Sequence, residues 1–314
     1  MEKILIHILG ELAPEQVEGL DLDARYLSDM GYPAISKIEG LDRFTSLEEL
    51  SLAGQQIPSW KGLPSLPRLS TLILADNELE NVNHAPDLAN LKDLDLSLNM
   101  LMTLEGMPEW KQLRSLDLGH NQITSIEALR NRQIERLVLS GNKRLKDLDI
   151  LTSLSDLKTL YAASLNIADW SWIRDSAIEE ISVTPSSSSA VSSLESSSIS
   201  KLTLSLPKCE TVLDLTGFGS LRELSMSKGR EGLVIHLPDA GLRHLQINHS
   251  SLRSLPEISQ GAYLESLDLR QNLLTELPSL SSFPKLKEVF LAGNPLSKSF
   301  CSKVELHPEI HWHL

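Results

Sequence analysis

LKDLDLSLNML, at residues 91–101, is the stretch of sequence that decides the fold. The same template returns in LSTLILADNEL (69–79), LRSLDLGHNQI (113–123), LESLDLRQNLL (264–274) and LKEVFLAGNPL (286–296). Apolar residues fill template positions 1, 4, 6 and 11, and asparagine fills position 9. Positions 3 to 7 alternate, which predicts a short strand whose residues at positions 4 and 6 face one side.

The template recurs along most of the chain, in which 62 of the 314 residues are leucine. Position 1 is filled in turn by Leu47, Leu69, Leu91, Leu113, Ile134, Leu157, Ile178, Ile199, Leu221, Leu242, Leu264 and Leu286. Successive units begin 21 to 23 residues apart. A period this constant over twelve units predicts a solenoid, in which each unit covers the apolar side of its neighbour.

Stacking of the units would join their strands into one parallel sheet over a leucine core. The asparagine at position 9 lies where the chain turns off the strand, so its amide can satisfy buried backbone groups of its own and adjacent turns. A degenerate thirteenth unit is expected at VEGLDLDARYL (17–27), which starts 30 residues before Leu47. This unit either carries an insertion or belongs to an N-terminal cap.

On these residues the chain resembles the leucine-rich-repeat superfamily over about residues 47–296. The segments at 38–41 (IEGL), 104–107 (LEGM) and 126–129 (IEAL) are similar to the protein-phosphatase-1 regulator and internalin types, whereas Leu255-Pro256 and Leu277-Pro278 look more like repeats of bacterial injected effectors. The resemblance implies an α/β repeat fold, a horseshoe with a concave parallel sheet of about 12–13 strands. It also implies ligand binding on that sheet, without assigning ligand residues.

The caps are expected at residues 1–46 and 297–314, on either side of the repeats at 47–296. ILIHIL (4–9) would add an edge strand or a short helix, and the C-terminal cap would close with Phe300, Val304, Leu306, Ile310 and Trp312. Between the canonical repeats, five consecutive units lack asparagine at position 9 and carry Leu165, Ser186, Pro207, Gly229 and Ser250.

The serine-rich segment 184–200 (TPSSSSAVSSLESSSIS) has two interpretations. Its composition is typical of a flexible linker between domains. Its register instead predicts a continuous repeat, because the apolar template positions of this unit hold Ile181, Val183, Val191 and Leu194. Limited proteolysis that cuts first within 186–198 would favour the interpretation as a flexible joint between domains.

The composition restricts the partners and the location. The net charge is −13, which disfavours the phosphate backbone of nucleic acids and favours a basic protein surface as partner. Two cysteines do not make a disulfide framework. The N-terminus lacks the pattern of a signal peptide, and no apolar run is long enough for a membrane span. We therefore expect a cytoplasmic protein, or one exported by a signal-less route.

Several residues that suggest chemistry have a simpler structural explanation. Trp60, Trp110 and Trp170 fall at apolar template positions and are expected in the core. Cys209 is expected to be a buried apolar residue and Cys301 a cap residue, while His307, His311 and His313 belong to the cap or a solvated tail. Asp76, Asp93, Asp95, Asp117 and His120 have no accompanying nucleophile, so neither a metal, a cofactor nor catalysis is expected.

Positions 3, 5 and 7 point away from the core, and they hold the predicted binding residues. Tyr161 and Phe290, at position 5, are expected to be exposed and to anchor a partner. The full set of predicted partner-binding residues is Glu49, Asp93, Asp95, Asp117, His120, Arg136, Tyr161, His244, Asp268, Arg270 and Phe290. We expect a non-enzymatic regulator or scaffold; the alternatives are a bacterial effector or toxin-neutralising immunity protein, and an enzyme that uses the acidic residues.

Overall fold

The computed structural model describes residues 4–5, 12–195, 198–206, 212–228, 234–238, 241–255, 263–276, 280, 283–297, 300 and 308–314. The chain forms two compact units, Met1–Asn166 (unit 1) and Ile167–Leu314 (unit 2). Some predicted residues lie outside the described ones, namely Cys209, Cys301, Val304, Leu306 and His307 and the position-9 residues Pro207 and Gly229. In the described part, no helix combines the length and apolar character needed to cross a membrane.

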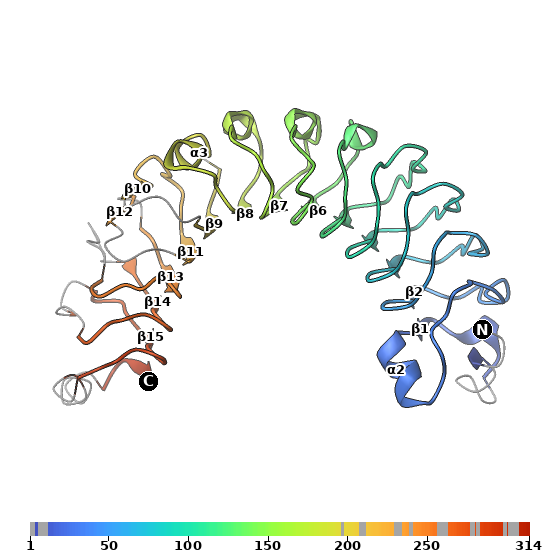
Figure 1. The fold of residues 1–314 in the computed structure, drawn as a ribbon, viewed down its shortest axis with the longest axis horizontal. Helices are drawn as coiled ribbons and strands as arrows, with labels where there is room; N and C mark the ends of the chain where they lie inside the picture. Colours follow the sequence, from blue (N-terminus) through green and yellow to red (C-terminus); the bar gives the residue numbers. More distant parts are fainter. Residues whose placement is uncertain are drawn as a thin grey trace. The chain divides into compact units, whose positions relative to one another are not determined.

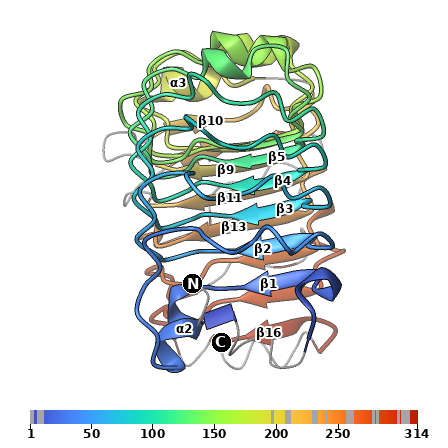
Figure 2. The ribbon, with the colours of Figure 1, turned by 90° about the vertical axis from the view of Figure 1, so that its right-hand side faces the viewer.

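Unit 1 is built on a parallel sheet whose strands follow the order of the sequence (Figure 1). Its strands are β1 (Gly19–Asp21), β2 (Glu49–Ser51), β3 (Thr71–Ile73), β4 (Asp93–Asp95), β5 (Ser115–Asp117), β6 (Arg136–Val138) and β7 (Thr159–Ala162). Figure 2 shows β1 to β5 stacked as successive rungs. A short helical segment, η1 (Pro14–Gln16), precedes β1, and the connections between strands carry α2 (Ala24–Asp29), η2 (Glu127–Leu129) and η3 (Asp149–Ser153).

Unit 2 has a parallel main sheet in the order β8-β9-β11-β13-β14-β15-β16. These strands are β8 (Glu180–Val183), β9 (Lys201–Ser205), β11 (Glu223–Ser227), β13 (His244–Asn248), β14 (Ser266–Asp268), β15 (Glu288–Phe290) and β16 (His311–His313). A second, two-stranded parallel sheet joins β10 (Val212–Asp214) to β12 (Val234–His236), and the helical segments are η4 (Ser171–Asp175) and α3 (Ser188–Ser192).

The pairing register reproduces the repeat spacing read from the sequence. Leu72 pairs with Leu94, an offset of 22 residues, whereas Leu116 pairs with Leu137 at 21 and Leu137 with Leu160 at 23. The degenerate unit also joins the sheet, because Leu20 of β1 pairs with Leu50 of β2 across the 30-residue step. The predicted parallel-sheet solenoid is confirmed, and β16 adds a strand beyond those of the predicted repeats.

The core consists of the residues that the template marks as apolar. The twelve position-1 residues are all buried, the most exposed being Leu242 and Leu286 at 5%. Trp60, Trp110 and Trp170 are buried as predicted, and the rings of Trp60 and Trp110 lie 5.9 Å apart between centroids. In the C-terminal cap, Phe300 and Ile310 are also buried.

The position-9 asparagines bridge adjacent turns. The Nδ2 of Asn99 donates to the carbonyl oxygens of Leu74 at 2.9 Å and Leu96 at 3.1 Å, while its Oδ1 accepts from the N–H of Leu79 at 2.9 Å. Each such amide satisfies backbone groups that water cannot reach, which explains a polar residue beside an apolar core. The same pattern recurs at Asn77, Asn121, Asn142, Asn272 and Asn294.

Gln55 fills position 9 of the first full repeat and was not identified by the asparagine pattern. Its Nε2 donates to the carbonyl of Leu22, and its Oε1 accepts from the N–H of Ile35, both at 2.6 Å. The longer amide therefore links β1 and the loop after α2 to the repeats. Gln55 can be identified from its place at template position 9, although its residue type differs from asparagine.

The serine-rich segment is packed in unit 2 over its described part. Ile181, Val183, Val191 and Leu194 are each at most 1% exposed, as the register predicts. Helix α3 begins in this segment, and the Oγ of Ser187 accepts a hydrogen bond from the N–H of Ala190 at 3.2 Å at its N-terminus. The buried apolar residues therefore give the segment the packing of a repeat.

Candidate functional site

The predicted binding residues lie in two sets, one in each unit. Template positions 4 and 6 are buried, so positions 3 and 5 of each strand form the open face of the sheet. Unit 1 carries Glu49, Asp93, Asp95, Asp117, Arg136 and Tyr161 on this face, and unit 2 carries His244, Asp268, Arg270 and Phe290 on or directly after its strands. His120 lies beyond the end of β5, in the turn, with a φ of 55°.

Three aspartates gather on β4 and β5. Asp95 and Asp117 are partners in the register of the two strands, and Asp93 is on the same face of β4. Asp93 is exposed, whereas Asp95 and Asp117 are half-buried. One oxygen of each half-buried carboxylate accepts a backbone N–H at 2.8 Å, from Ser97 and Gly119 respectively. These bonds fix the two carboxylates at the carboxyl ends of β4 and β5, so their direction is set before any partner arrives.

The surroundings of Asp117 disfavour the charged form of its carboxyl group. Burial raises the pKa of its carboxyl above the usual value, and the nearby Asp95 carboxylate raises it further. The N–H of Gly119 and the charge of Arg136 act in the opposite direction and lower the pKa, without cancelling the effect of burial. Two carboxylates this close repel one another, so a cation placed between them would relieve an existing cost.

An aromatic ring and a cation stand beside these aspartates. The guanidinium carbon of Arg136 on β6 lies 5.1 Å from the centroid of the Tyr161 ring on β7. Tyr161 is half-buried rather than exposed, because this cation covers part of it. Val138, which lies between Asp117 and Tyr161 in the register, was also expected on the open face but is only 9% exposed.

The set in unit 2 is largely paired within itself. Arg270 Nη2 lies 2.6 Å from Asp268 Oδ2, and the same guanidinium lies 5.5 Å from the centroid of the Phe290 ring. Phe290 is half-buried rather than exposed, since it stacks on His313 of β16 with centroids 4.1 Å apart. His311 and His313 thus belong to an edge strand of the cap. This set offers less unpaired charge than the aspartates of unit 1.

The turn after β4 carries residues that the prediction missed. Leu98, Met100 and Met102 occupy template positions 8, 10 and 12, and they are 51%, 45% and 50% exposed. The template records only the buried positions, so these outward-facing residues were passed over. An apolar residue at an outward position, where neighbouring repeats have polar ones, was the signal that could have found them.

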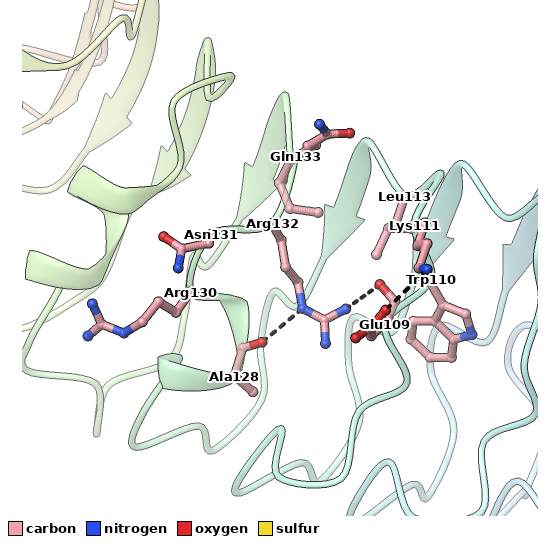
Figure 3. A pocket seen from close by; sticks show the side chains of 10 residues that line it. Glu109, Trp110, Lys111, Leu113, Ala128, Arg130, Asn131, Arg132 and Gln133 are labelled. Atoms are coloured by element: carbon pink, nitrogen blue, oxygen red, sulfur yellow. Dashed lines mark hydrogen bonds and ion pairs between the residues drawn. The ribbon is translucent and has the colours of Figure 1, made fainter.

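A separate hollow of about 540 Å³ opens between two successive loops of unit 1 (Figure 3). Arg132 lies at its centre and donates to the carbonyl oxygens of Ala128 at 2.8 Å, Pro108 at 2.8 Å and Glu109 at 2.7 Å. Burial lowers the pKa of its guanidinium. The cation is already held by carbonyl dipoles, so we interpret Arg132 as a clamp between repeats.

Comparisons with known proteins agree with the fold. The family described as leucine-rich repeats (2 copies) matches residues 111–153. An internalin of Listeria monocytogenes has a similar structure, with 18% sequence identity and a TM-score of 0.59, over 98% of this chain and 86% of that chain. A leucine-rich-repeat protein of Leptospira interrogans is 21% identical over 99% of this chain and 98% of that chain, with a TM-score of 0.45. No curated protein sequence matches significantly.

The matched residues 111–153 contain β5 and β6, the strands that carry Asp117 and Arg136. The likeness to the internalin concerns the fold alone, since fewer than one residue in five is identical. Together with the repeat period and the strand register, the family match at residues 111–153 and the likeness to the internalin support a leucine-rich-repeat fold for this chain.

Proposed function

We propose that the protein is a non-enzymatic binding module, a regulator or scaffold, that recognises a basic protein surface on the open face of unit 1. The observation that carries this proposal is the group of Asp93, Asp95 and Asp117, which lies beside the Arg136–Tyr161 pair. None of these side chains is needed by the leucine core. A face of this kind combines charge for orientation with an aromatic ring for contact area.

The chemistry of the face favours a cation on the partner. The aspartates are close enough for Asp95 to raise the pKa of Asp117, and the net charge of the chain is −13. A lysine or arginine side chain of the partner would neutralise this repulsion, whereas a phosphate would increase it. The arrangement therefore supports a protein partner over a nucleic acid.

Backbone groups hold the strand aspartates in place, as a recognition surface requires. Asp95 and Asp117 each use one carboxylate oxygen to accept a backbone N–H, which fixes the direction in which the two charges are presented. No group of three or more histidine, cysteine, aspartate or glutamate side chains in the described part of the chain is arranged to hold a metal ion. Binding through preset carboxylates needs no such group.

The test is capture of partners from the native organism, with identification by mass spectrometry. The immobilised wild-type protein is compared with a variant that carries Asp93→Asn, Asp95→Asn and Asp117→Asn. Asparagine keeps an oxygen that can accept the N–H of Ser97 or Gly119, so only the charge is removed. We expect the variant to lose the partner. The wild-type protein should capture less of the partner as the salt concentration is raised.

A matched control removes three other acidic charges from unit 1. Glu39, Glu105 and Asp149 are exposed and lie between the strands rather than on them. The variant with Glu39→Gln, Glu105→Gln and Asp149→Asn has the same net charge as the strand-face variant, and it should keep the partner. Equal capture by the wild type and the strand-face variant would show that this face is not the binding surface.

A further inference from the structure

The turn after β4 presents an apolar row of three side chains, Leu98, Met100 and Met102, which we call the apolar row. Each is about half exposed. In the next repeat the same template positions hold His120, Gln122 and Thr124, which are polar and exposed. Since the fold accepts polar residues at these positions, burial in the core does not explain the apolar ones.

The backbone adds a second cost at Leu98. Template position 8 has a positive φ in unit 1, as in Gly54 at 68°, Asp76 at 56° and Leu98 at 54°. Glycine, aspartate and asparagine tolerate this left-handed conformation, whereas for leucine it costs about 1 kcal/mol. Leu98 is therefore unfavourable both in its backbone and in its exposure to water. A residue that destabilises the fold in two ways is expected to have a role other than stability, such as binding.

An acidic row lies directly beside the apolar row. It consists of Asp76, Glu78 and Glu80, the exposed residues at the same positions of the preceding repeat. The backbones of the two turns are hydrogen-bonded: the N–H of Met100 donates to the carbonyl of Leu79 at 2.9 Å, and the N–H of Asp76 donates to the carbonyl of Ser97 at 2.9 Å. Adjacent rows are thus held side by side, about 5 Å apart as in a parallel ladder.

We propose that the apolar row and the acidic row together bind a basic amphipathic segment of a partner protein. Its apolar side chains would cover Leu98, Met100 and Met102, and its lysine or arginine side chains would contact Asp76, Glu78 and Glu80. Methionine suits this role because its flexible, polarisable side chain adapts to the shape of an apolar partner. This surface is on the turns and adds to the strand face, so the inference does not rest on the proposed function.

Charge favours a basic segment of a partner protein over two other occupants of this surface, a second copy of the chain and an anionic bilayer. A second copy of the chain, related by a twofold axis, would bring one acidic row close to the other, which is repulsive. An anionic bilayer would also be repelled by Asp76, Glu78 and Glu80. A segment with an apolar stripe next to basic side chains complements both rows at once.

The experiment uses fluorescein-labelled helical peptides of about 18 residues and fluorescence anisotropy. The probe has a leucine stripe on one face, with lysine and arginine on both sides of the stripe. One comparison peptide has the same composition in a scrambled order that leaves no apolar face. Another keeps the stripe and carries glutamate in place of the basic residues. We expect the wild-type protein to bind the probe at least about ten-fold more tightly than either comparison peptide.

Two variants of the protein separate the rows. Leu98→Asn, Met100→Gln and Met102→Thr remove the apolar row and place residues that suit these positions, so thermal stability should be kept or raised. This variant should lose about ten-fold or more in affinity for the probe. Asp76→Asn, Glu78→Gln and Glu80→Gln should weaken binding and reduce its dependence on salt.

Leu273 supplies the matched control. It occupies template position 10 of a repeat in unit 2 and is 41% exposed, so Leu273→Gln removes a comparable apolar side chain elsewhere. Its affinity for the probe should equal that of the wild type. The inference is overturned if the apolar-row variant binds the probe as tightly as the wild type, or if the scrambled peptide binds as tightly as the probe.

Two further outcomes would assign the surface to another occupant and overturn the inference. One is a wild-type dimer in analytical ultracentrifugation that the apolar-row variant converts to a monomer. The other is binding to phosphatidylserine–phosphatidylcholine vesicles that the same variant abolishes. The peptide assay uses no natural partner, so its failure leaves the proposed function of the strand face untouched.

Discussion

The Oδ1 of Asn121 accepts a hydrogen bond from the backbone N–H of Leu101, which lies 2.9 Å away in the preceding turn. Its Nδ2 donates to the carbonyl oxygens of Leu96 at 2.9 Å and Leu118 at 3.1 Å. Asn121 is only 6% exposed, so water cannot replace these bonds. One side chain therefore ties two repeats together and supports the turn that positions Asp117 and His120.

Asn121→Ala should destabilise unit 1 strongly. Alanine leaves the buried N–H of Leu101 without a partner and removes one of the two side-chain donors to the carbonyls of Leu96 and Leu118, which keep Asn99 and Asn142. The combined loss is expected to cost about 3 kcal/mol. Urea unfolding followed by circular dichroism measures the change. Asn83→Ala is the control, because Asn83 is exposed in a loop of the same unit. Equal loss of stability in the two variants would contradict the bridging role of Asn121.

Asp117→Asn should raise the stability of unit 1 at neutral pH. The folded-state pKa of Asp117 lies above its ordinary value of 3.8, mainly because of burial, so deprotonation favours the unfolded chain. This penalty develops as the pH rises from 3.8 through the folded-state pKa, and it stays constant above that. Asparagine has no such penalty and still can accept the N–H of Gly119.

Thermal unfolding at pH 7 and near pH 3 tests this sign. The midpoint of Asp117→Asn should exceed that of the wild type at pH 7, and the difference should shrink towards pH 3, where both side chains are neutral. Asp93→Asn is the control, since Asp93 is exposed on the neighbouring strand. A gain that is independent of pH would mean that burial of the charge is not its cause.

The spacing of the leucines was sufficient to predict the sheet. Within unit 1 and within unit 2, each step between successive repeats reappears as a pairing offset, even where it departs from 22, as between Leu116, Leu137 and Leu160. The reason is physical: one coil can bury its apolar side only if its leucines stand opposite those of the next coil. The pattern of buried residues therefore determined the register without any knowledge of the turns.

The open face was predicted less well, because alternation determines only the side to which a residue points. Arg136 at position 3 reaches diagonally across the sheet to the ring of Tyr161 at position 5 of the next strand, and Val138 at position 5 is only 9% exposed. These contacts depend on neighbouring side chains. The strands β10 and β12 were also not predicted, since the template assigns no strand to the segment after position 11.

Gly62→Ala should be the most damaging single-methyl change among the described glycines of unit 1. The φ of Gly62 is 95°, and a Cβ built there would collide with the backbone carbonyl oxygen of Ile38. Ile38 is 1% exposed and cannot move away easily. The combined strain should cost more than about 2 kcal/mol, which urea unfolding would detect.

Gly19→Ala provides the comparison for that change. Gly19 begins β1, and no atom lies within 4 Å of a Cβ built there. Alanine should change the free energy of unfolding by less than about 1 kcal/mol, because it only restricts the unfolded chain. Equal changes in the free energy of unfolding for Gly62→Ala and Gly19→Ala would mean that the approach of Gly62 to the loop at Ile38 does not constrain the N-terminal part of unit 1.

Val191→Asp tests whether the serine-rich segment is a repeat or a joint. Val191 is 1% exposed beside Leu194 at 0%, so an aspartate there would bury a charge within unit 2 and destabilise it by about 3 kcal/mol or more. Hydrogen exchange of the β8 and β9 amides should accelerate. Ser192→Asp introduces the same charge at an exposed position and should leave this exchange unchanged. A flexible joint predicts the opposite result: the two variants would exchange alike, and protease would cut wild-type protein first between 186 and 195.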